Sequence, residues 1–150
     1  MPQYLDGRTS QNASYNGSIN IPTSEDYQLF GTLGLNVSEA NPTAIIRVQF
    51  DGIITFSLSG SPGSFTNLLE IKIVRGTDPN LPPVFRGIKT LTANGAEGTP
   101  QEYSFTASDY NVPKGSGFLL YTAFVRNVTG FVEAEVMRIG PESFNASAIG

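Results

Sequence analysis

Few residues of this chain have types and spacings that could support catalysis. Glu133 and Glu135 lie two residues apart in a segment with strand-like alternation, which would place their carboxylates on one face about 7 Å apart. That separation falls within the range used by glycosidases that invert configuration. Alternating charges on a strand are also the ordinary pattern of a solvated face, and we interpret the pair in that simpler way.

Two loop segments carry oxygen ligands of the kind that Ca²⁺ prefers. They place Asp78 near Asn80 and Asp109 near Asn111. Aspartate and asparagine also form turns without any ion, because their side chains hydrogen-bond to nearby backbone groups. We interpret both segments as turns and predict no metal site.

A nucleophilic serine would have no evident activating base in this chain. The sequence contains no His and no Cys, which excludes the common catalytic triads. A serine paired with lysine would depend on Lys72, Lys89 or Lys114, and nothing around these residues points to such a pair. We predict that the protein is not an enzyme and has no catalytic residue, cofactor or metal.

Composition limits the partners that the protein is expected to bind. The 150 residues fit a single domain with a net charge of −4. The nine basic residues are scattered, whereas nucleic-acid binding needs a concentrated basic patch. No apolar run approaches the roughly 20 residues of a membrane-spanning helix. The sequence therefore predicts neither a nucleic-acid nor a membrane partner.

The first residues do not have the pattern of a secretory signal. A basic start followed by an apolar block is missing. Two routes to the cell exterior stay open: removal of an earlier leader, or release by cell lysis.

Residues 1–26 are more polar than the rest of the chain, and we predict an N-terminal extended arm there, followed by a jelly-roll domain over 27–150. The simplest interpretation of such a segment is a disordered tail. However, Tyr15, Ile19 and Ile21 would lie on one side of an extended strand. Such a strand could add to a sheet of its own subunit or of a neighbouring one.

From residue 27 onward, apolar residues alternate with a period of two. One predicted strand face carries Tyr27, Leu29, Leu33, Leu35 and Val37. Asp51-Gly52 is a strong hairpin signal between two further apolar runs. A bulged turn over residues 51–53 would align Ile46, Val48 and Phe50 with Ile54, Phe56 and Leu58.

The remaining segments continue the strand pattern. Residues 69–73 alternate apolar side chains with Glu70 and Lys72, which predicts a half-exposed strand. Residues 118–125 are apolar on both faces and belong in the centre of the fold or at a subunit contact. Roughly eight to ten short strands separated by Gly- and Pro-rich breakers predict an all-β fold, an antiparallel jelly-roll sandwich.

Several apolar residues fall on strand faces that we expect to point outward. They are Ile45, Ile53, Leu119, Tyr121 and Val125. Contacts between identical subunits would bury them, and a closed ring, most simply a trimer, would satisfy all copies. The predicted assembly interface comprises Tyr4, Leu5, Tyr15, Ile19, Ile21, Leu119, Tyr121 and Val125.

Four phrases in the second half of the chain carry a resemblance to a known family. They are residues 73–77 (IVRGT), 104–113 (SFTASDYNVP), 120–125 (LYTAFV) and 138–145 (RIGPESFN). The chain resembles small jelly-roll proteins of the surface layers and appendages of bacterial endospores, which are similar to tumour-necrosis-factor-type sandwiches that form trimers. The resemblance covers roughly half of the chain.

This resemblance implies an extracellular, non-enzymatic structural protein of the spore surface or its appendages. Trimers would stack into a fibre, with the N-terminal arm of one subunit docked into the next, and a surface anchor protein would be a further partner. The absence of Cys excludes a disulfide-locked fibre.

Two alternatives remain open. A viral or phage decoration protein would cap a capsid lattice and stay soluble by itself. A carbohydrate-binding module would use exposed aromatic rings, with Tyr103, Tyr110 and Tyr121 as candidates.

Overall fold

The structure is a computed structural model that describes residues 2–59, 64–94, 99–128 and 135–150. Within these ranges the chain forms ten strands and no helix. The strands are β1 (Tyr4–Ala13), β2 (Ile21–Pro22), β3 (Gln28–Asn36), β4 (Ile46–Ser59), β5 (Ser64–Arg75), β6 (Pro83–Asn94), β7 (Gln101–Val112), β8 (Phe118–Asn127), β9 (Glu135–Arg138) and β10 (Glu142–Ile149). None of the described segments is a helix that could cross a membrane.

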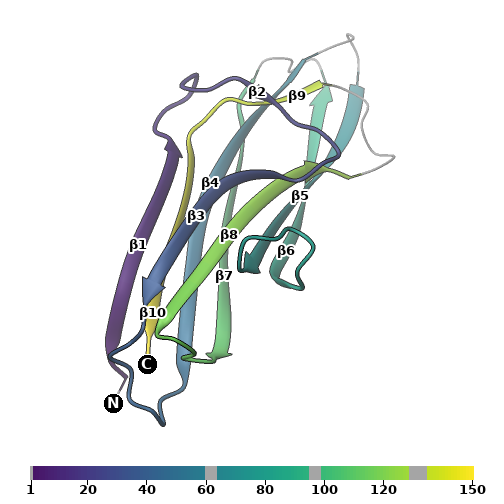
Figure 1. The fold of residues 1–150 in the computed structure, drawn as a ribbon. Coiled ribbons are helices and arrows are strands. Elements are labelled where there is room, and N and C mark those ends of the chain that lie inside the picture. The colour runs from purple at the N-terminus through teal and green to yellow at the C-terminus, as the bar shows by residue number, and fades with distance from the viewer. Residues whose placement is uncertain (1, 60–63, 95–98, 129–134) are drawn as a thin grey trace.

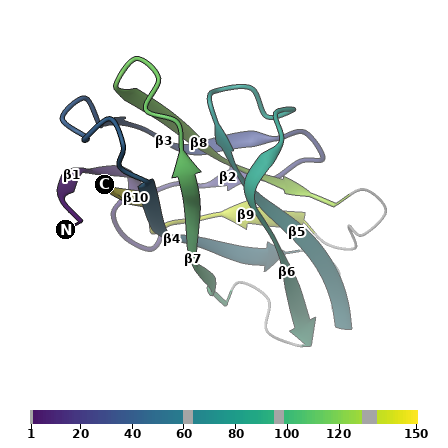
Figure 2. The same cartoon turned by 90° about the horizontal axis from the view of Figure 1, so that it is seen from below.

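The strands form two antiparallel sheets that pack face to face (Figures 1 and 2). Sheet I contains β1, β10, β4 and β7 in that order, and β9 and β2 extend it beside the far end of β4. Sheet II contains β3, β8, β5 and β6. Strands from β3 to β10 pass repeatedly between the two sheets, which is the winding of a jelly roll. The predicted all-β jelly-roll sandwich is confirmed.

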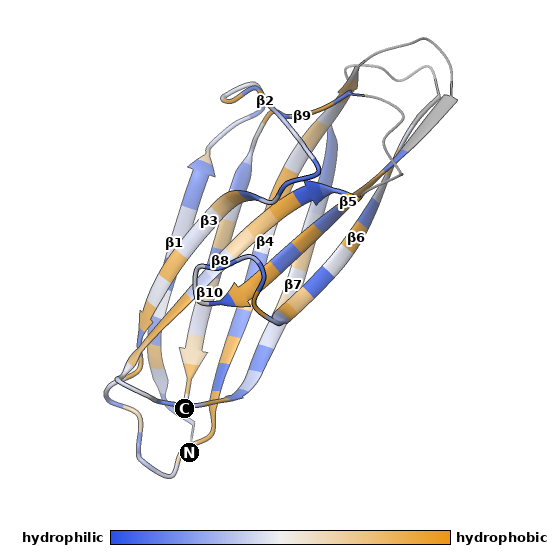
Figure 3. Cartoon of the chain, turned by 45° about the vertical axis from the view of Figure 1, so that its right-hand side comes forward, coloured by the Kyte–Doolittle hydropathy of each residue, from blue (hydrophilic) through white to orange (hydrophobic). Residues whose placement is uncertain are grey.

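Alternating hydropathy along the strands places one apolar face of each sheet toward the core (Figure 3). The rings of Phe50 and Phe144 stack with their centroids 5.6 Å apart, and Tyr121 meets Phe50 edge-on at 4.8 Å. All three side chains are buried. Because aromatic side chains bury large areas, this cluster joins the two sheets at the centre of the sandwich.

Strand β4 runs without interruption from Ile46 to Ser59, so the predicted bulged turn over residues 51–53 is wrong. Gly52 pairs with Phe144 on one side and with Phe105 on the other. A Cβ atom at residue 52 would lie 2.4 Å from Cζ of Phe105. The glycine therefore allows an aromatic ring to pack closely against the backbone in the middle of the strand. Because glycine is found both in turns and at such close approaches, its presence here did not identify a turn.

Strand β3 follows its predicted pattern only in its second half. Leu33, Leu35 and Val37 are buried as expected, whereas Leu29 is 53% exposed and Phe30 is buried in its place. A register shift between Leu29 and Gly31 causes this difference. Such a bulge moves every earlier side chain to the opposite face.

Strand β5 is not half-exposed as predicted. Leu69, Ile71 and Ile73 face the core, but Glu70 and Lys72 on the opposite face are also buried, at 0% and 8% exposure. The connection from β5 to β6 folds over this outer face, where Lys72 Nζ donates to the Pro79 carbonyl at 2.5 Å. The alternation within β5 does not predict this burial, because the residues that bury the outer face belong to other segments.

Candidate assembly site

Strand β1, within the predicted N-terminal arm, lies at the edge of sheet I and pairs with β10 of the same chain. The antiparallel register runs from Tyr4 opposite Ile149 to Ala13 opposite Glu142. Beyond it, Gln3 and Gly150 exchange two backbone hydrogen bonds of 2.5 and 2.8 Å. Main-chain pairing therefore reaches both ends of the strand, interrupted by irregularities at Leu5 and Asn12. Both ends of the chain lie at the same end of the sandwich (Figure 1).

Two β1 side chains also bind the backbone of β3, the neighbouring edge strand of sheet II. Asp6 Oδ2 accepts the Asn36 amide at 2.8 Å. Ser10 Oγ accepts the Thr32 amide at 3.1 Å. These bonds satisfy edge amides that would otherwise face water, so β1 closes one side of the sandwich.

Hydrophobic burial contributes little to the docking of β1. Within this strand only Ala13 is buried, and Leu5 packs partly against the core. The exposed fraction of Tyr4 is 66%. Because hydrophobic stabilisation scales with the apolar area buried, β1 is held mainly by hydrogen bonds made by its backbone and by the Asp6 and Ser10 side chains. The β1 strand of another copy can make the same bonds.

The segment after β1 is not the strand predicted over residues 15–21. Residues 15–18 form a turn in which Ser18 Oγ donates to the Tyr15 carbonyl at 2.5 Å, and Gly17 takes a φ of 86°. The Gly17 amide donates to the Ile139 carbonyl at 2.8 Å. Only Ile21 and Pro22 are extended, as β2 beside β9. A positive φ at Gly17 is incompatible with continuous pairing.

The predicted interface residues fall into two groups. Tyr4 and Tyr15 are each 66% exposed, and Leu5, Ile19 and Ile21 are partly buried. Their contact with another subunit stays a prediction. Leu119, Tyr121 and Val125 instead face the core, so their predicted outward orientation is wrong. Strand β8 lies between β3 and β5, and its odd-numbered residues point into the sandwich.

A buried ion pair lies beside the C-terminal end of β1. Arg138 donates to Glu142 through Nη2 at 2.6 Å and through Nε at 2.7 Å, and the two side chains are 3% and 0% exposed. Asn12 Nδ2 donates to the same carboxylate at 2.8 Å. The pair therefore links β9 and β10 to β1. Sequence reasoning missed it because nothing local indicates that these two charges are buried.

A second buried carboxylate, Glu70, lies on the outer face of sheet II. It accepts hydrogen bonds from Tyr27 Oη, from Arg86 Nε and, at 2.8 Å, from Arg126 Nε. Burial raises the pKa of Glu70, but these three hydrogen bonds lower it further than burial raises it. Burial and the Glu70 carboxylate both raise the pKa of Tyr27. The cluster ties strands β5, β6 and β8 together.

Asp109 lies within strand β7, so the turn predicted at residues 109–111 is wrong. It accepts two hydrogen bonds from Arg75 Nη2 and one of 2.8 Å from the buried Tyr121 hydroxyl. Burial, reinforced by Asp109, raises the pKa of Tyr121. Of the three tyrosines considered for sugar stacking, Tyr121 is therefore in the core, whereas Tyr103 is partly buried and Tyr110 is 65% exposed.

The described residues contain no group of three or more His, Cys, Asp or Glu side chains that could hold a metal ion. Glu133 lies outside the described residues, and its predicted partner Glu135 is exposed. Lys72 Nζ donates to the Pro79 carbonyl, and Lys114 Nζ donates to the Ala40 carbonyl.

Acidification is expected to loosen β1. The Asn36 amide holds the pKa of Asp6 below its ordinary value of 3.8, despite some opposing desolvation. A carboxylate with a lowered folded-state pKa stabilises the fold above its ordinary pKa, and this contribution is lost as the pH falls through the lowered value. As the pH falls from about 6 to about 2, we expect the protection of β1 amides against hydrogen exchange to decrease relative to the protection of β8 amides. An Asp6→Asn variant should lose that difference; equal protection of β1 at both pH values in the unmodified protein would contradict the expectation.

Comparisons with known proteins identify similar folds only distantly. No protein-family model and no curated protein matches the chain. A bacterial lipoprotein from Bacteroides thetaiotaomicron VPI-5482 is 13% identical over 97% of this chain and 83% of its own, with a TM-score of 0.35. A structure of infectious bursal disease virus, Gx strain, is 9% identical over 99% of this chain and 36% of its own, with a TM-score of 0.38.

A family 16 carbohydrate-binding module is 11% identical over 95% of this chain and 82% of its own, with a TM-score of 0.22. Likenesses of this strength say nothing about what the chain binds. Its own strand order and register define it as a jelly-roll β-sandwich, closed along one edge by strand β1.

Proposed function

We propose that the protein is a non-enzymatic structural subunit that assembles with copies of itself by exchange of strand β1. The observation that supports this most directly is the way in which β1 is held. Its pairing with β10 and its contacts to Asn36 and Thr32 are hydrogen bonds to backbone, and Ala13 is the one side chain of the strand that is buried. A β1 strand from a second copy can make the same bonds.

Exchange of an identical element is thermodynamically cheap because the hydrogen bonds that break within one subunit form again with another. The balance is then decided by protein concentration and by the segment that connects β1 to the sandwich. A reciprocal or cyclic exchange closes after two or three copies, whereas successive exchange between neighbours produces an open fibre. We propose the open form, with trimers as the stacking unit.

The proposed location is the surface or an appendage of a bacterial endospore, outside the cell. The sequence phrases that resemble endospore surface proteins support this proposal, and the absence of Cys suits a noncovalent fibre exposed to oxidants. A surface anchor protein would be the further partner that attaches the fibre.

Deletion of residues 1–13 tests the proposal. We expect regular fibres of the full-length protein in negative-stain electron microscopy and only discrete particles after deletion. Because the truncated chain could misfold, a second measurement adds a synthetic peptide of residues 2–13 to assembling full-length protein. The peptide should compete for β10 and shorten the fibres, whereas a scrambled peptide should not. Discrete particles from the full-length protein at high concentration would contradict self-polymerisation.

A further inference from the structure

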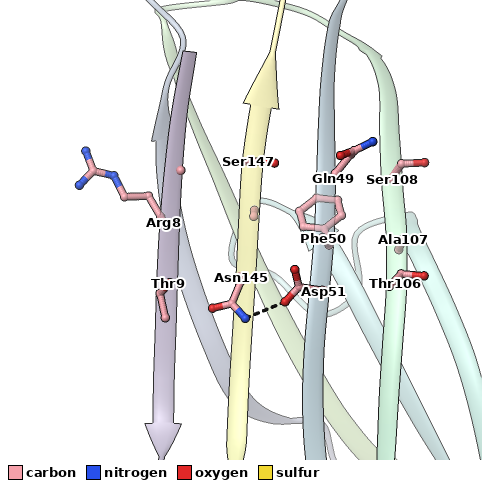
Figure 4. A pocket seen from close by; sticks show the side chains of 12 residues that line it. Arg8, Thr9, Gln49, Phe50, Asp51, Thr106, Ala107, Ser108, Asn145 and Ser147 are labelled. Carbon is pink, nitrogen blue, oxygen red and sulfur yellow. Dashed lines mark hydrogen bonds between the residues drawn. The ribbon is translucent and has the colours of Figure 1, made fainter. Parts of the chain in front are cut away.

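The outer face of sheet I carries a shallow trough across four strands (Figure 4). The cross-strand register aligns its side chains in rows. One row contains Thr9, Asn145, Asp51 and Thr106, and the next contains Gly7, Ser147, Gln49 and Ser108. These residues are small or hydrogen-bonding, and they surround a hollow of about 690 Å³.

A second hollow of about 550 Å³ includes Arg47, two residues before Gln49 on β4, and shares no lining residue with the first. Arg47 and Tyr110 are directly opposite each other in the register and both line it. The rows from Thr106 to Tyr110 extend over five residues of β7, and the four rises between them give a length of about 14 Å. This length would accommodate a short linear oligomer of a few monomer units.

Polar groups in the trough are arranged as donors beside acceptors. Asn145 Nδ2 donates to Asp51 Oδ1 at 2.8 Å, as Figure 4 shows. Arg47 and Gln49 make no side-chain hydrogen bond or ion pair within the described part of the chain, and both are exposed. A carboxylate, two amides and a guanidinium on one face can together bind neighbouring hydroxyl groups, each of which both donates and accepts.

One exposed tyrosine lies near the trough at each edge of the sheet. Tyr110 is 65% exposed on β7, at one edge. Tyr4 lies on β1 at the other edge, with its hydroxyl over Gly7, where a Cβ atom would be only 2.4 Å away. Exposed tyrosine rings offer an apolar face with a polar tip, which suits the C–H face of a sugar ring.

From this geometry we infer that the trough binds a linear oligosaccharide of neutral pyranose units. Vicinal hydroxyls would bond to Asp51, Asn145 and Gln49, and a further ring would stack on Tyr110 beside Arg47. A second protein subunit suits this face less well, because protein interfaces are depleted in Ser and Asp, which line the trough. Strand β1 contributes Gly7 and Thr9 to the trough, and an exchanged β1 from another copy would contribute the same two residues, so the inference holds with or without exchange.

The test is isothermal titration of the full-length protein with hexaoses of β-linked glucose, N-acetylglucosamine, xylose and mannose. We expect at least one to bind, and expect Tyr110→Ala and Gln49→Ala each to weaken that binding at least tenfold. Tyr15→Ala is the matched control, since Tyr15 is as exposed as Tyr110 but lines neither hollow. Circular dichroism of each variant confirms folding.

Binding by none of the four hexaoses at millimolar concentration would overturn the inference, as would binding that both trough variants leave unchanged. A loss of binding caused by Tyr15→Ala would also contradict it, because it would place the sugar elsewhere. Electron microscopy of the same samples shows separately whether the protein assembles. Fibres that bind no sugar would contradict sugar binding in the trough but not the proposed assembly.

Discussion

Replacing Glu142 by alanine is expected to lower the free energy of unfolding by about 3–5 kcal/mol. The change leaves the Arg138 guanidinium buried, at 3% exposure, without the carboxylate that accepts its bonds of 2.6 and 2.7 Å. An unpaired buried charge is strongly unfavourable. Asn12 also loses its acceptor, so β1 should dock less firmly. Urea denaturation followed by tyrosine fluorescence or circular dichroism measures the change.

Two controls define the origin of this effect. Arg8→Ala breaks the exposed Arg8–Asp6 pair, in which the Arg8 side chain is 57% exposed, and should change stability by less than about 1 kcal/mol. The double variant Arg138→Met with Glu142→Leu removes both charges and should recover much of the loss. A loss of under about 1 kcal/mol for Glu142→Ala would show that the pair is not buried as described.

Replacing Phe144 by alanine is expected to cost about 3–5 kcal/mol in the free energy of unfolding. Phe144 is fully buried on β10, stacks on Phe50 at 5.6 Å and lies against the Gly31 backbone. Its removal leaves a cavity between the sheets that rigid neighbouring strands cannot fill. Thermal and urea unfolding of the variant measure the loss.

Phe118→Ala provides a matched control for Phe144→Ala. Phe118 is the same residue type on another strand but is 59% exposed, so its loss should cost no more than about 1 kcal/mol. Equal losses for the two variants would contradict the assignment of Phe144 to the core and Phe118 to the surface.

Local patterns were sufficient to predict the class of the fold. Apolar alternation follows from the burial of one face of a sheet. The Gly- and Pro-rich segments 76–82 and 113–117 separate strands as such residues usually do. Residues 118–125, apolar on both faces, were correctly expected near the centre of the fold, where β8 lies between β3 and β5. The outward orientation of Leu119, Tyr121 and Val125 was wrong because the pattern of a two-sided apolar strand does not show which side faces the core.

The features that local patterns missed depend on contacts between distant segments. Glu70 is buried because Tyr27, Arg86 and Arg126 cover it from other parts of the chain. Residue 52 is a glycine in the middle of β4 because the Phe105 ring occupies the space that a Cβ atom would need. The partners of Glu70 and the ring beside Gly52 come from distant parts of the sequence, so the residues next to Glu70 and Gly52 do not predict them.

The N-terminal strand illustrates the same limit at the candidate assembly site. The paired strand is the polar segment Tyr4–Ala13, whereas the apolar alternation of Tyr15, Ile19 and Ile21 suggested a later one. An edge strand that pairs by main chain needs no apolar face, so hydropathy does not reveal it. Its docking against β3 through Asp6 and Ser10 depends on the assembly of the two sheets, which no local pattern encodes.

Exchange of β1 between subunits is tested most directly by a disulfide across the β1–β10 pair. Thr9 and Asn145 are directly opposite in the register, and the natural chain has no Cys to compete. The double variant Thr9→Cys with Asn145→Cys is assembled under reducing conditions, oxidised and separated on a non-reducing denaturing gel, with each single variant as a control. Our account predicts a ladder of covalent multimers, because each bond would join β1 of one copy to β10 of the next. Fibres that yield only cross-linked monomers would show that β1 stays in its own subunit and would contradict assembly by strand exchange.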